Sequence, residues 1–388
     1  MTDYLLLLAP AANRVYAQAT PVLAAAELEL TGGFEAICPT EVAGVSYVGF
    51  SAATLGSDEL AIVAKQSAAL ALFARLPAAP SALTPSLEAA FCEPRPPVGS
   101  AATAEAGKNE RGQDVKEALH PIALPPAFVM DDDLVSIPKY HGKTNEQFTR
   151  LLLNVTLAAC RTGAARPEVL DPLAGRGTTL TTAWLYGLDA AGVEVDDKAF
   201  EAMAAYLKTY LRTKRFKHTA AITPVRRDGR ALGRRFDATL KDAPNLKLSV
   251  FTGDTRDSAK LYGKRRFDCI VTDAPYGVSH GARNDVGGSG AAGRRPAPVP
   301  RTRSPEKLLA EAIPVWASQL KPGGALGIAY NTFTQPREQL LDGCRAAGLE
   351  PMTGGAWERL AHRVDQAILR DVVVAVQAGR EQQAEEVV

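Results

Sequence analysis

The 388-residue chain has few cysteines, and none of them is arranged as a metal site or a disulfide framework. The five cysteines stand far apart, with no CxxC pair and no histidine at ligand spacing, so we expect no metal. No apolar run is long enough to span a membrane. The apolar segment "YLLLLAPAA" follows Asp3 instead of a basic region, so we expect no signal peptide, no membrane partner and a cytoplasmic location.

The chain also lacks an excess of charge of either sign, because 44 basic and 43 acidic residues leave a net charge of +1. This balance excludes a global electrostatic field that would draw the whole protein onto a polyanion. The chain does contain 46% hydrophobic residues, and it is long enough for two domains. We therefore expect a globular protein whose contacts with nucleic acid, if any, use local clusters of charge.

Residues 1–91 are typical of a small N-terminal α/β domain. We expect a strand at "DYLLLLA", a helix over 15–30, two strands in "FEAICPTEVAGVSYVGF" and a second helix at "KQSAALALFARL", residues 65–76. Three basic minus eight acidic residues give this segment a charge of −5, which does not favour phosphate binding. Residues 92–130 are rich in proline, alanine and charge without a sustained period, which predicts a linker.

Residues 131–388 alternate strand and helix patterns, which predicts a doubly wound parallel sheet of the Rossmann type. Seven strands are expected, at "EVLDPLA", "DAAGVEV", "KLSVFTGD", "FDCIVTDAP", "GALGIAYN", "LEPMTGGAW" and "LRDVVVAVQ". In open sheets of this class, ligands bind at the carboxyl ends of the strands. The residues that follow each expected strand are therefore the candidates for a functional site.

Three successive strand ends carry groups suited to an adenosine. The loop "DPLAGRG" starts at Asp171, and its glycines allow the backbone to turn closely against a ligand. Glu194 ends the next strand, about 20 residues on, where an acid can accept both ribose hydroxyls. Asp254 ends the third strand and can accept from an adenine amino group. Each acid alone would be a solvated loop residue, but together the three favour a binding site.

The loop "DPLAGRG" has neither the GxGxxG spacing nor the P-loop lysine, so it does not predict a cradle for phosphates. With these motifs and the turn "LKPGG", residues 131–388 resemble the class I S-adenosylmethionine-dependent methyltransferases. The resemblance implies S-adenosylmethionine as cofactor. It also implies a set of cofactor-binding residues: Asp171, Pro172, Ala174, Gly175, Gly177, Thr178, Glu194, Val195, Asp254, Thr255 and Phe148.

The turn "DAPYG" at the end of the fourth strand resembles the [DNS]PP[YF] element of methyltransferases that modify exocyclic amino nitrogens. Such an amine is a poor nucleophile and needs orientation more than deprotonation. Asp273 and the carbonyl of Ala274 can accept its two N–H groups, while Pro275 and Tyr276 offer a rigid edge and a stacking face. Ala274 stands where the family has proline, which leaves the carbonyl in place but stiffens the turn less.

The order of the motifs and the small front domain most resemble the tRNA guanosine-10 N2-methyltransferase group and its THUMP-type relatives. In that group the front domain helps hold tRNA, which makes residues 1–91 a candidate substrate-recognition domain. In "KYHGKTNEQF", Lys143, Thr144 and Phe148 are candidates for the methionine end of the cofactor. An ordinary amphipathic helix capped by Asn145 explains this stretch equally well.

Positive charge gathers in residues 198–247, where thirteen basic minus four acidic residues give +9. The 280–303 loop adds five arginines against one aspartate. Such clusters favour a polyanion. The resemblance to the tRNA N2-methyltransferase group implies that this polyanion is tRNA or another structured RNA and that guanine N2 is the methylated atom. A DNA adenine or cytosine methyltransferase, a small-molecule or peptide methyltransferase and a non-catalytic cofactor-binding module remain open. The sequence predicts no oligomeric state.

Overall fold

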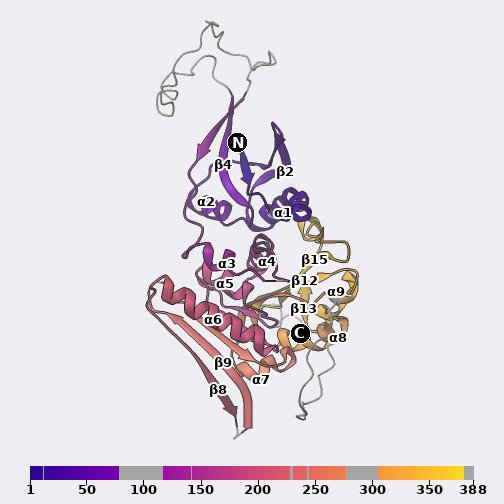
Figure 1. The fold of residues 1–388 in the computed structure, drawn as a ribbon. Helices are drawn as coiled ribbons and strands as arrows, with labels where there is room; N and C mark the ends of the chain where they lie inside the picture. Colours follow the sequence, from indigo (N-terminus) through magenta and orange to yellow (C-terminus); the bar gives the residue numbers. More distant parts are fainter. Residues whose placement is uncertain are drawn as a thin grey trace, which may run out of the picture.

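The computed structural model describes residues 1–11, 13–77, 117–140, 142–227, 230–242, 244–276 and 305–379. The expected basic loop 280–303 and most of the expected linker therefore lie outside the described residues. Figure 1 shows a smaller N-terminal unit above a larger one that holds the main sheet. Among the helices of the described ranges, none is long and apolar enough to cross a bilayer.

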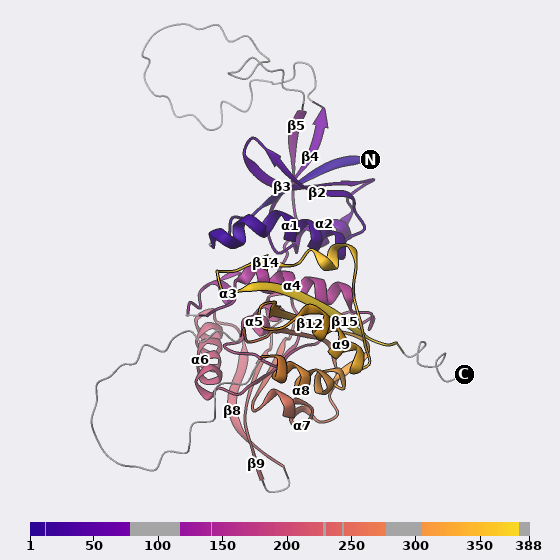
Figure 2. The same ribbon diagram turned by 90° about the vertical axis from the view of Figure 1, so that its right-hand side faces the viewer.

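The N-terminal unit is an antiparallel five-stranded sheet of order β2-β3-β1-β4-β5, packed against helices α1 and α2. Its elements are β1 (Thr2–Leu8), α1 (Arg14–Thr31), β2 (Glu35–Val42), β3 (Val45–Ala52), α2 (Ser57–Ala64), β4 (Ala69–Pro77) and β5 (Glu117–Ile122). Figure 2 shows α1 lying between this sheet and the larger unit. The expected strand, helix and strand pair before residue 53 are all present.

Two expectations in this region are wrong. The helix expected over 65–76 is strand β4, which pairs with β1 on one side and β5 on the other. In the middle of β4 the burial follows a period of two, with Leu72 and Ala74 buried and Ala71 and Phe73 only partly buried, although its alanine and leucine content favours a helix. The expected linker 92–130 contains β5, whose pairing with β4 supplies the backbone hydrogen bonds of both strands.

The larger unit has a ten-stranded sheet of order β13-β15-β12-β11-β6-β7-β10-β9-β8, with β14 paired to β15. The strands are β6 (Val169–Asp171), β7 (Ala190–Glu194), β8 (His218–Arg227), β9 (Arg230–Leu240), β10 (Lys247–Thr252), β11 (Phe267–Asp273), β12 (Leu320–Asn331), β13 (Leu349–Pro351), β14 (His362–Arg363) and β15 (Leu369–Gln377). The five strands β6, β7, β10, β11 and β12 are parallel, and β15 is antiparallel to β12. All seven expected strands are present.

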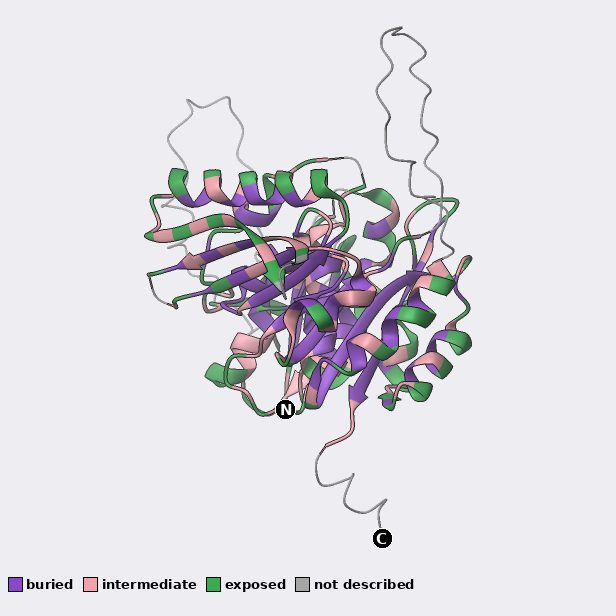
Figure 3. Ribbon diagram, turned by 90° about the horizontal axis from the view of Figure 1, so that it is seen from below, coloured by how far each residue is buried: buried purple, intermediate pink, exposed green. Residues whose placement is uncertain are grey.

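Helices cover both faces of this sheet, as in a doubly wound fold. They are α3 (Asp133–Ser136), α4 (Glu146–Ala159), α5 (Thr178–Leu185), α6 (Asp197–Thr213), α7 (Ser258–Tyr262), α8 (Pro305–Ala317) and α9 (Arg337–Ala346), with short 3-10 turns η2 (Thr255–Asp257) and η3 (Gly355–Glu358). Cys269 and Val271 of β11 join the core under α4, α5 and α6, whereas Ile270 joins the core under α8 and α9. Figure 3 shows the buried strands between helices whose outer sides are exposed.

Part of the basic region 198–247, between the second and third expected strands, forms an additional hairpin. Strands β8 and β9 pair antiparallel and extend the sheet beyond β10, beside α6 (Figure 1). Phe236, Ala238 and Leu240 of β9 are buried and alternate with less buried residues, so one face of the hairpin belongs to the core. The extra length of this region therefore builds sheet as well as a charged surface.

A buried polar cluster joins the two units. Glu27 of α1 is fully buried and accepts hydrogen bonds from the Asn154 side chain of α4, at 2.6 Å, and from the backbone N–H of Ser67, at 3.0 Å. Burial raises the pKa of Glu27 to about 7. This carboxyl group was counted in the −5 charge of residues 1–91, but it does not lie on the surface.

Candidate active site

A cavity of about 470 Å³ opens at the carboxyl edge of the sheet, between the ends of β6 and β11. Here the chain order reverses, because β7 and β10 continue on one side of β6 while β11 and β12 lie on the other. Such a switch point is where open α/β sheets bind ligands, and the volume is typical of a small-molecule site. The lining includes Tyr140, Lys143, Thr144, Asp171, Ala174, Gly175, Arg176, Thr178, Asp273, Ala274, Pro275, Tyr276 and Arg370.

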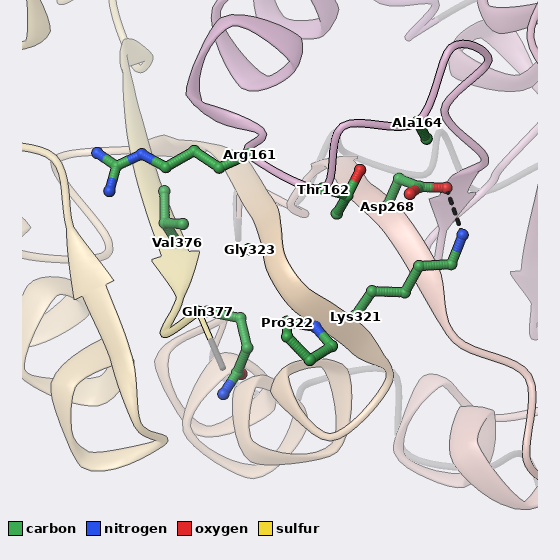
Figure 4. Close-up of a pocket in the computed structure, with 10 residues that line it drawn as sticks. Arg161, Thr162, Ala164, Asp268, Lys321, Pro322, Gly323, Val376 and Gln377 are labelled. Carbon is green, nitrogen blue, oxygen red and sulfur yellow. Dashed lines mark hydrogen bonds and ion pairs between the residues drawn. The ribbon is translucent and has the colours of Figure 1, made fainter. Parts of the chain in front are cut away.

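A larger cavity, of about 720 Å³, lies at the opposite edge of the sheet, where β11 and β12 begin. Figure 4 shows its lining, in which Asp268 and Lys321 form an ion pair of 2.8 Å. Gly323 of the turn "LKPGG" belongs to this lining. Size alone would select this cavity, but it is at the amino ends of the parallel strands and contains none of the expected site residues. We therefore locate the candidate site in the smaller cavity.

Asp273, in the turn after β11, is held in a hydrogen-bond network. The Thr144 hydroxyl donates to Asp273 Oδ2 at 2.7 Å, and the Tyr276 hydroxyl donates to Oδ1 at 2.5 Å. The backbone N–H of Ala274 donates to the carbonyl of Ala329 in β12 at 2.9 Å, which ties the turn to the sheet. All four residues expected in the catalytic turn line the cavity.

The glycine loop faces the same cavity. Gly175 and Gly177 have φ values of +55° and +83°, which favour glycine. A Cβ at Gly177 would lie 2.7 Å from the sulfur of Met203, whereas one at Gly175 would meet no atom within 4 Å. The backbone at Gly175 is therefore open to a ligand, while Gly177 is needed for packing under the first turn of α5.

Two carboxyl groups support this loop. Asp171 is buried and accepts from the Thr272 hydroxyl at 2.9 Å and from the backbone N–H of Leu173 at 3.1 Å. Burial raises the pKa of Asp171 to about 6. Glu194 accepts from the N–H of Gly175 at 2.6 Å, so it fixes the loop, and burial raises its pKa as well.

Several residues expected in the cofactor site do not line the cavity: Pro172, Gly177, Glu194, Val195, Asp254, Thr255 and Phe148. Val195 is 73% exposed beyond β7, and Asp254 forms an ion pair of 2.5 Å with Arg256. Glu194 and Asp254 still stand at adjacent strand ends, because the N–H of Gly253 donates to the Glu194 carbonyl at 2.9 Å. The glycine loop and the turn after β11 thus line one cavity, whereas Glu194 and Asp254 lie outside its lining.

Phe148 of α4 is fully buried under a residue that the sequence interpretation missed. The guanidinium of Arg370 lies 4.1 Å from the centre of the Phe148 ring, and its Nε donates to the Tyr276 hydroxyl at 2.5 Å. Arg370 lines the cavity although only 4% of it is exposed. The signal in the sequence was an arginine inside the apolar strand "LRDVVVAVQ". Because β15 runs antiparallel, its first residues reach the edge where the parallel strands end.

The basic region 198–247 is less free than its composition suggested. Arg234 forms ion pairs with Asp197, at 2.6 Å, and with Glu201, at 2.8 Å. Arg235 is paired with Asp237 at 2.6 Å. Other basic residues there are exposed and have no ion pair within the described residues: Lys198, Arg212, Arg215, Lys217, Arg226, Lys241 and Lys247. The positive surface of this region is therefore formed by these seven exposed residues.

No family model and no curated protein matches this chain. Among solved structures, TrmN from Thermus thermophilus aligns with 97% of this chain and 100% of its own, at 15% identity and a TM-score of 0.41. The T. thermophilus 16S rRNA N2 G1207 methyltransferase (RsmC), in complex with AdoMet and guanosine, covers 61% of this chain and 44% of its own, at 18% and 0.33.

A TehB-like SAM-dependent methyltransferase from Corynebacterium glutamicum covers 56% of this chain and 83% of its own, at 15% identity and a TM-score of 0.31. Scores of this size carry no argument about activity. The α/β fold class follows instead from the strand order and strand directions of this chain.

Proposed function

We propose that this protein is an S-adenosylmethionine-dependent methyltransferase that acts on an exocyclic amino nitrogen of a nucleic-acid base. Guanine N2 in tRNA or another structured RNA is the first candidate. The observation that carries the proposal is that the glycine loop after β6 and the Asp273–Tyr276 turn after β11 face one cavity of about 470 Å³. A cofactor loop and an amine-orienting turn must meet in this way for a methyl group to pass between them.

The residues around the cavity fit the cofactor. The open backbone at Gly175 and the carboxyl group of Asp171 suit its methionine end, which carries positive charge. The Glu194 oxygens each keep a lone pair beyond the bonds from Gly175 and Asp196, so they can accept the ribose hydroxyls. Asp254, at the end of the next strand, is the candidate for the adenine amino group.

In the proposed reaction Asp273 and the Ala274 carbonyl accept the two N–H groups of the substrate amine and so aim its lone pair at the cofactor. When bound, the cofactor would supply its sulfonium methyl group. The bond between nitrogen and the methyl carbon would form as the carbon–sulfur bond breaks, and the electrons of the broken bond would stay on sulfur. The nitrogen then loses one of its protons, and the base that takes it is the Asp273 carboxylate, which already accepts that N–H. Pro275 and Tyr276 border the base, and the bonds that Thr144 and Tyr276 donate hold the partly buried Asp273 carboxylate in place.

A small-molecule or peptide amine is the second candidate substrate. The ion pairs of Arg234 and Arg235 favour it, because they remove charge from the surface expected to hold a polyanion. Residues 1–91 then have a role other than binding tRNA, and their acidic composition is compatible with that.

To test this proposal, the purified protein and methyl-labelled cofactor are incubated separately with total tRNA, ribosomal RNA, genomic DNA and a small-molecule extract. We expect label in tRNA, and none with Asp273→Ala. Asp342→Ala, at an exposed residue of α9, is the matched control and should label as the wild type does. Label confined to the small-molecule extract would move the assignment to the second candidate. Absence of label in all four would contradict methyl transfer.

A further inference from the structure

Arg370 is held rigidly at the wall of the cavity. It is the second residue of β15, opposite Asn331 of β12, and its guanidinium lies between the rings of Phe148 and Tyr276, at 4.1 and 5.2 Å from their centres. Only 4% of the residue is exposed. A buried guanidinium fixed by two aromatic rings has few alternative positions, so its N–H groups point in set directions.

The Tyr276 hydroxyl bridges Arg370 and Asp273. It accepts from Arg370 Nε at 2.5 Å and donates to Asp273 Oδ1 at 2.5 Å, and Arg370 Nη2 lies 4.0 Å from Asp273 Oδ2. A substrate amine that takes the place of Tyr276 on Asp273 Oδ1 displaces this hydroxyl from the carboxylate. The Arg370 N–H then loses its acceptor, and a buried charged donor without an acceptor is strongly unfavourable.

A substrate that displaces the hydroxyl satisfies both groups only if it copies the hydrogen-bond pattern of that hydroxyl, which donates on one side and accepts on the other. An amino group on a ring carbon next to an unprotonated ring nitrogen has this pattern. The amine donates to Asp273, and the ring nitrogen accepts from Arg370. Adenine, cytosine and guanine all carry such a pair. A free alkylamine has no neighbouring acceptor and is protonated at neutral pH, so Arg370 repels it.

Resting on the proposed function, we propose that Arg370 determines substrate specificity by recognising the acceptor beside the reactive amine. The Asp273–Arg370 pair thereby selects neutral heteroaromatic amines and rejects alkylamines, including lysine side chains. Within the second candidate class, small heteroaromatic amines remain substrates and peptide lysines do not.

The experiment compares matched oligonucleotides that contain either the methylated base or its deaza analogue, in which C–H replaces the ring nitrogen beside the amine. For the wild type we expect kcat/KM to be at least about 100-fold lower on the analogue, because a site built to hydrogen-bond a group rejects the molecule that lacks it. With Arg370→Met the difference should shrink below about tenfold. Replacing the ring nitrogen also changes the reactivity of the amine, but equally for both enzymes. Dividing the base-to-analogue ratio of kcat/KM for the wild type by that for Arg370→Met therefore isolates the effect of Arg370.

Arg363→Met is the matched control, because Arg363 is an exposed arginine of β14 that does not line the cavity. It should keep the wild-type ratio. Tyr276→Phe is a second variant, which removes the bridging hydroxyl and keeps the ring. We expect it to retain discrimination against the analogue and to lower KM for the true base, since the substrate no longer displaces a hydroxyl from Asp273.

Equal turnover of base and analogue by the wild type would overturn the role of Arg370 and leave methyl transfer to the base intact. Full discrimination in Arg370→Met, or its loss in Tyr276→Phe, would overturn it too. Methylation of lysine peptides by the wild type would contradict both the inference and the proposed base substrate. An absence of methyl transfer to any amine would remove the proposed function itself.

Discussion

The candidate-site cavity and the β8–β9 region place their polar groups in different environments. In the cavity, Asp273 accepts hydrogen bonds from the Tyr276 hydroxyl at 2.5 Å and from the Thr144 hydroxyl at 2.7 Å, and Thr144 is distant in the sequence. In the hairpin, Arg234 of β9 is paired with surface acids of α6. A charge in a buried network has its geometry fixed, whereas an exposed pair contributes little and competes with any ligand. The fixed geometry of the cavity is therefore a better indicator of function than the net charge of residues 198–247.

The largest expected effect is at Asp273. Asp273→Ala removes the acceptor that orients the amine, so methyl transfer should fall by roughly a hundredfold or more while cofactor affinity stays nearly unchanged. Steady-state kinetics with calorimetry of cofactor binding separates the two. If affinity and turnover were lost together, Asp273 would be a structural residue and the contrast between the two regions would break.

The next effect concerns the cofactor. Glu194→Ala removes the proposed acceptor of the ribose hydroxyls and also the acceptor of the Gly175 N–H. Binding of S-adenosylmethionine should weaken by roughly 2–3 kcal/mol in calorimetry. Glu201→Ala, at an exposed glutamate of α6, is the matched control. Unchanged affinity in Glu194→Ala would exclude this carboxylate from the site.

The third prediction concerns Glu27, a buried carboxyl group outside the cavity, and its effect on the pH dependence of stability. Burial raises its pKa from 4.5 to about 7, so its contribution to stability is complete below pH 4.5 and is lost as the pH rises through about 7. Glu27→Gln stays neutral. Its free energy of unfolding should therefore rise relative to the wild type by about 2 kcal/mol between about pH 5 and pH 8.

Denaturant unfolding at several pH values measures this difference, with Glu29→Gln on the same helix as the exposed control. A difference for Glu27→Gln that is flat with pH would mean that this carboxyl group titrates normally and does not couple the two units to proton binding.

The smallest effects belong to the charged surface, and there the paired and unpaired arginines should differ. Arg212→Ala with Arg226→Ala should reduce the salt slope of RNA binding by roughly 0.7–0.9 per lost phosphate contact. Arg234→Ala with Arg235→Ala should change it much less, because both side chains already have acidic partners. Filter binding over a range of salt concentrations measures the slope. Equal changes in the two double variants would show that the ion pairs open for RNA.

Local pattern was sufficient to place the seven strands, although of the expected strand "LEPMTGGAW" only Leu349–Pro351 is a strand. Asp171 and Asp273 were identified because a buried strand followed by a turn residue marks the functional edge of a parallel sheet. Arg370 was missed because its position depends on the antiparallel direction of β15, which is a property of the whole sheet. The helix expected over 65–76 was wrong for a related reason, since pairing with β1 and β5 outweighs the helical propensity of that segment.

The charge estimates failed for a different physical reason. Counting residues cannot show that Glu27 is buried or that Arg234 is neutralised by Asp197 and Glu201, because both depend on packing between distant segments. The hairpin β8–β9 was missed because its alternating pattern is interrupted by many charged residues. Composition in this region predicted a surface but not which of its charges are free.

The central claim is that Asp273 directs a methyl group onto an exocyclic amine. Mass spectrometry of nucleosides from tRNA treated with the enzyme and deuteromethyl-labelled cofactor tests this most directly. We expect the label on an exocyclic nitrogen, in yield that falls at least about a hundredfold with Asp273→Ala. Label on a ribose oxygen, a ring carbon or a ring nitrogen, or undiminished label with Asp273→Ala, would contradict the account.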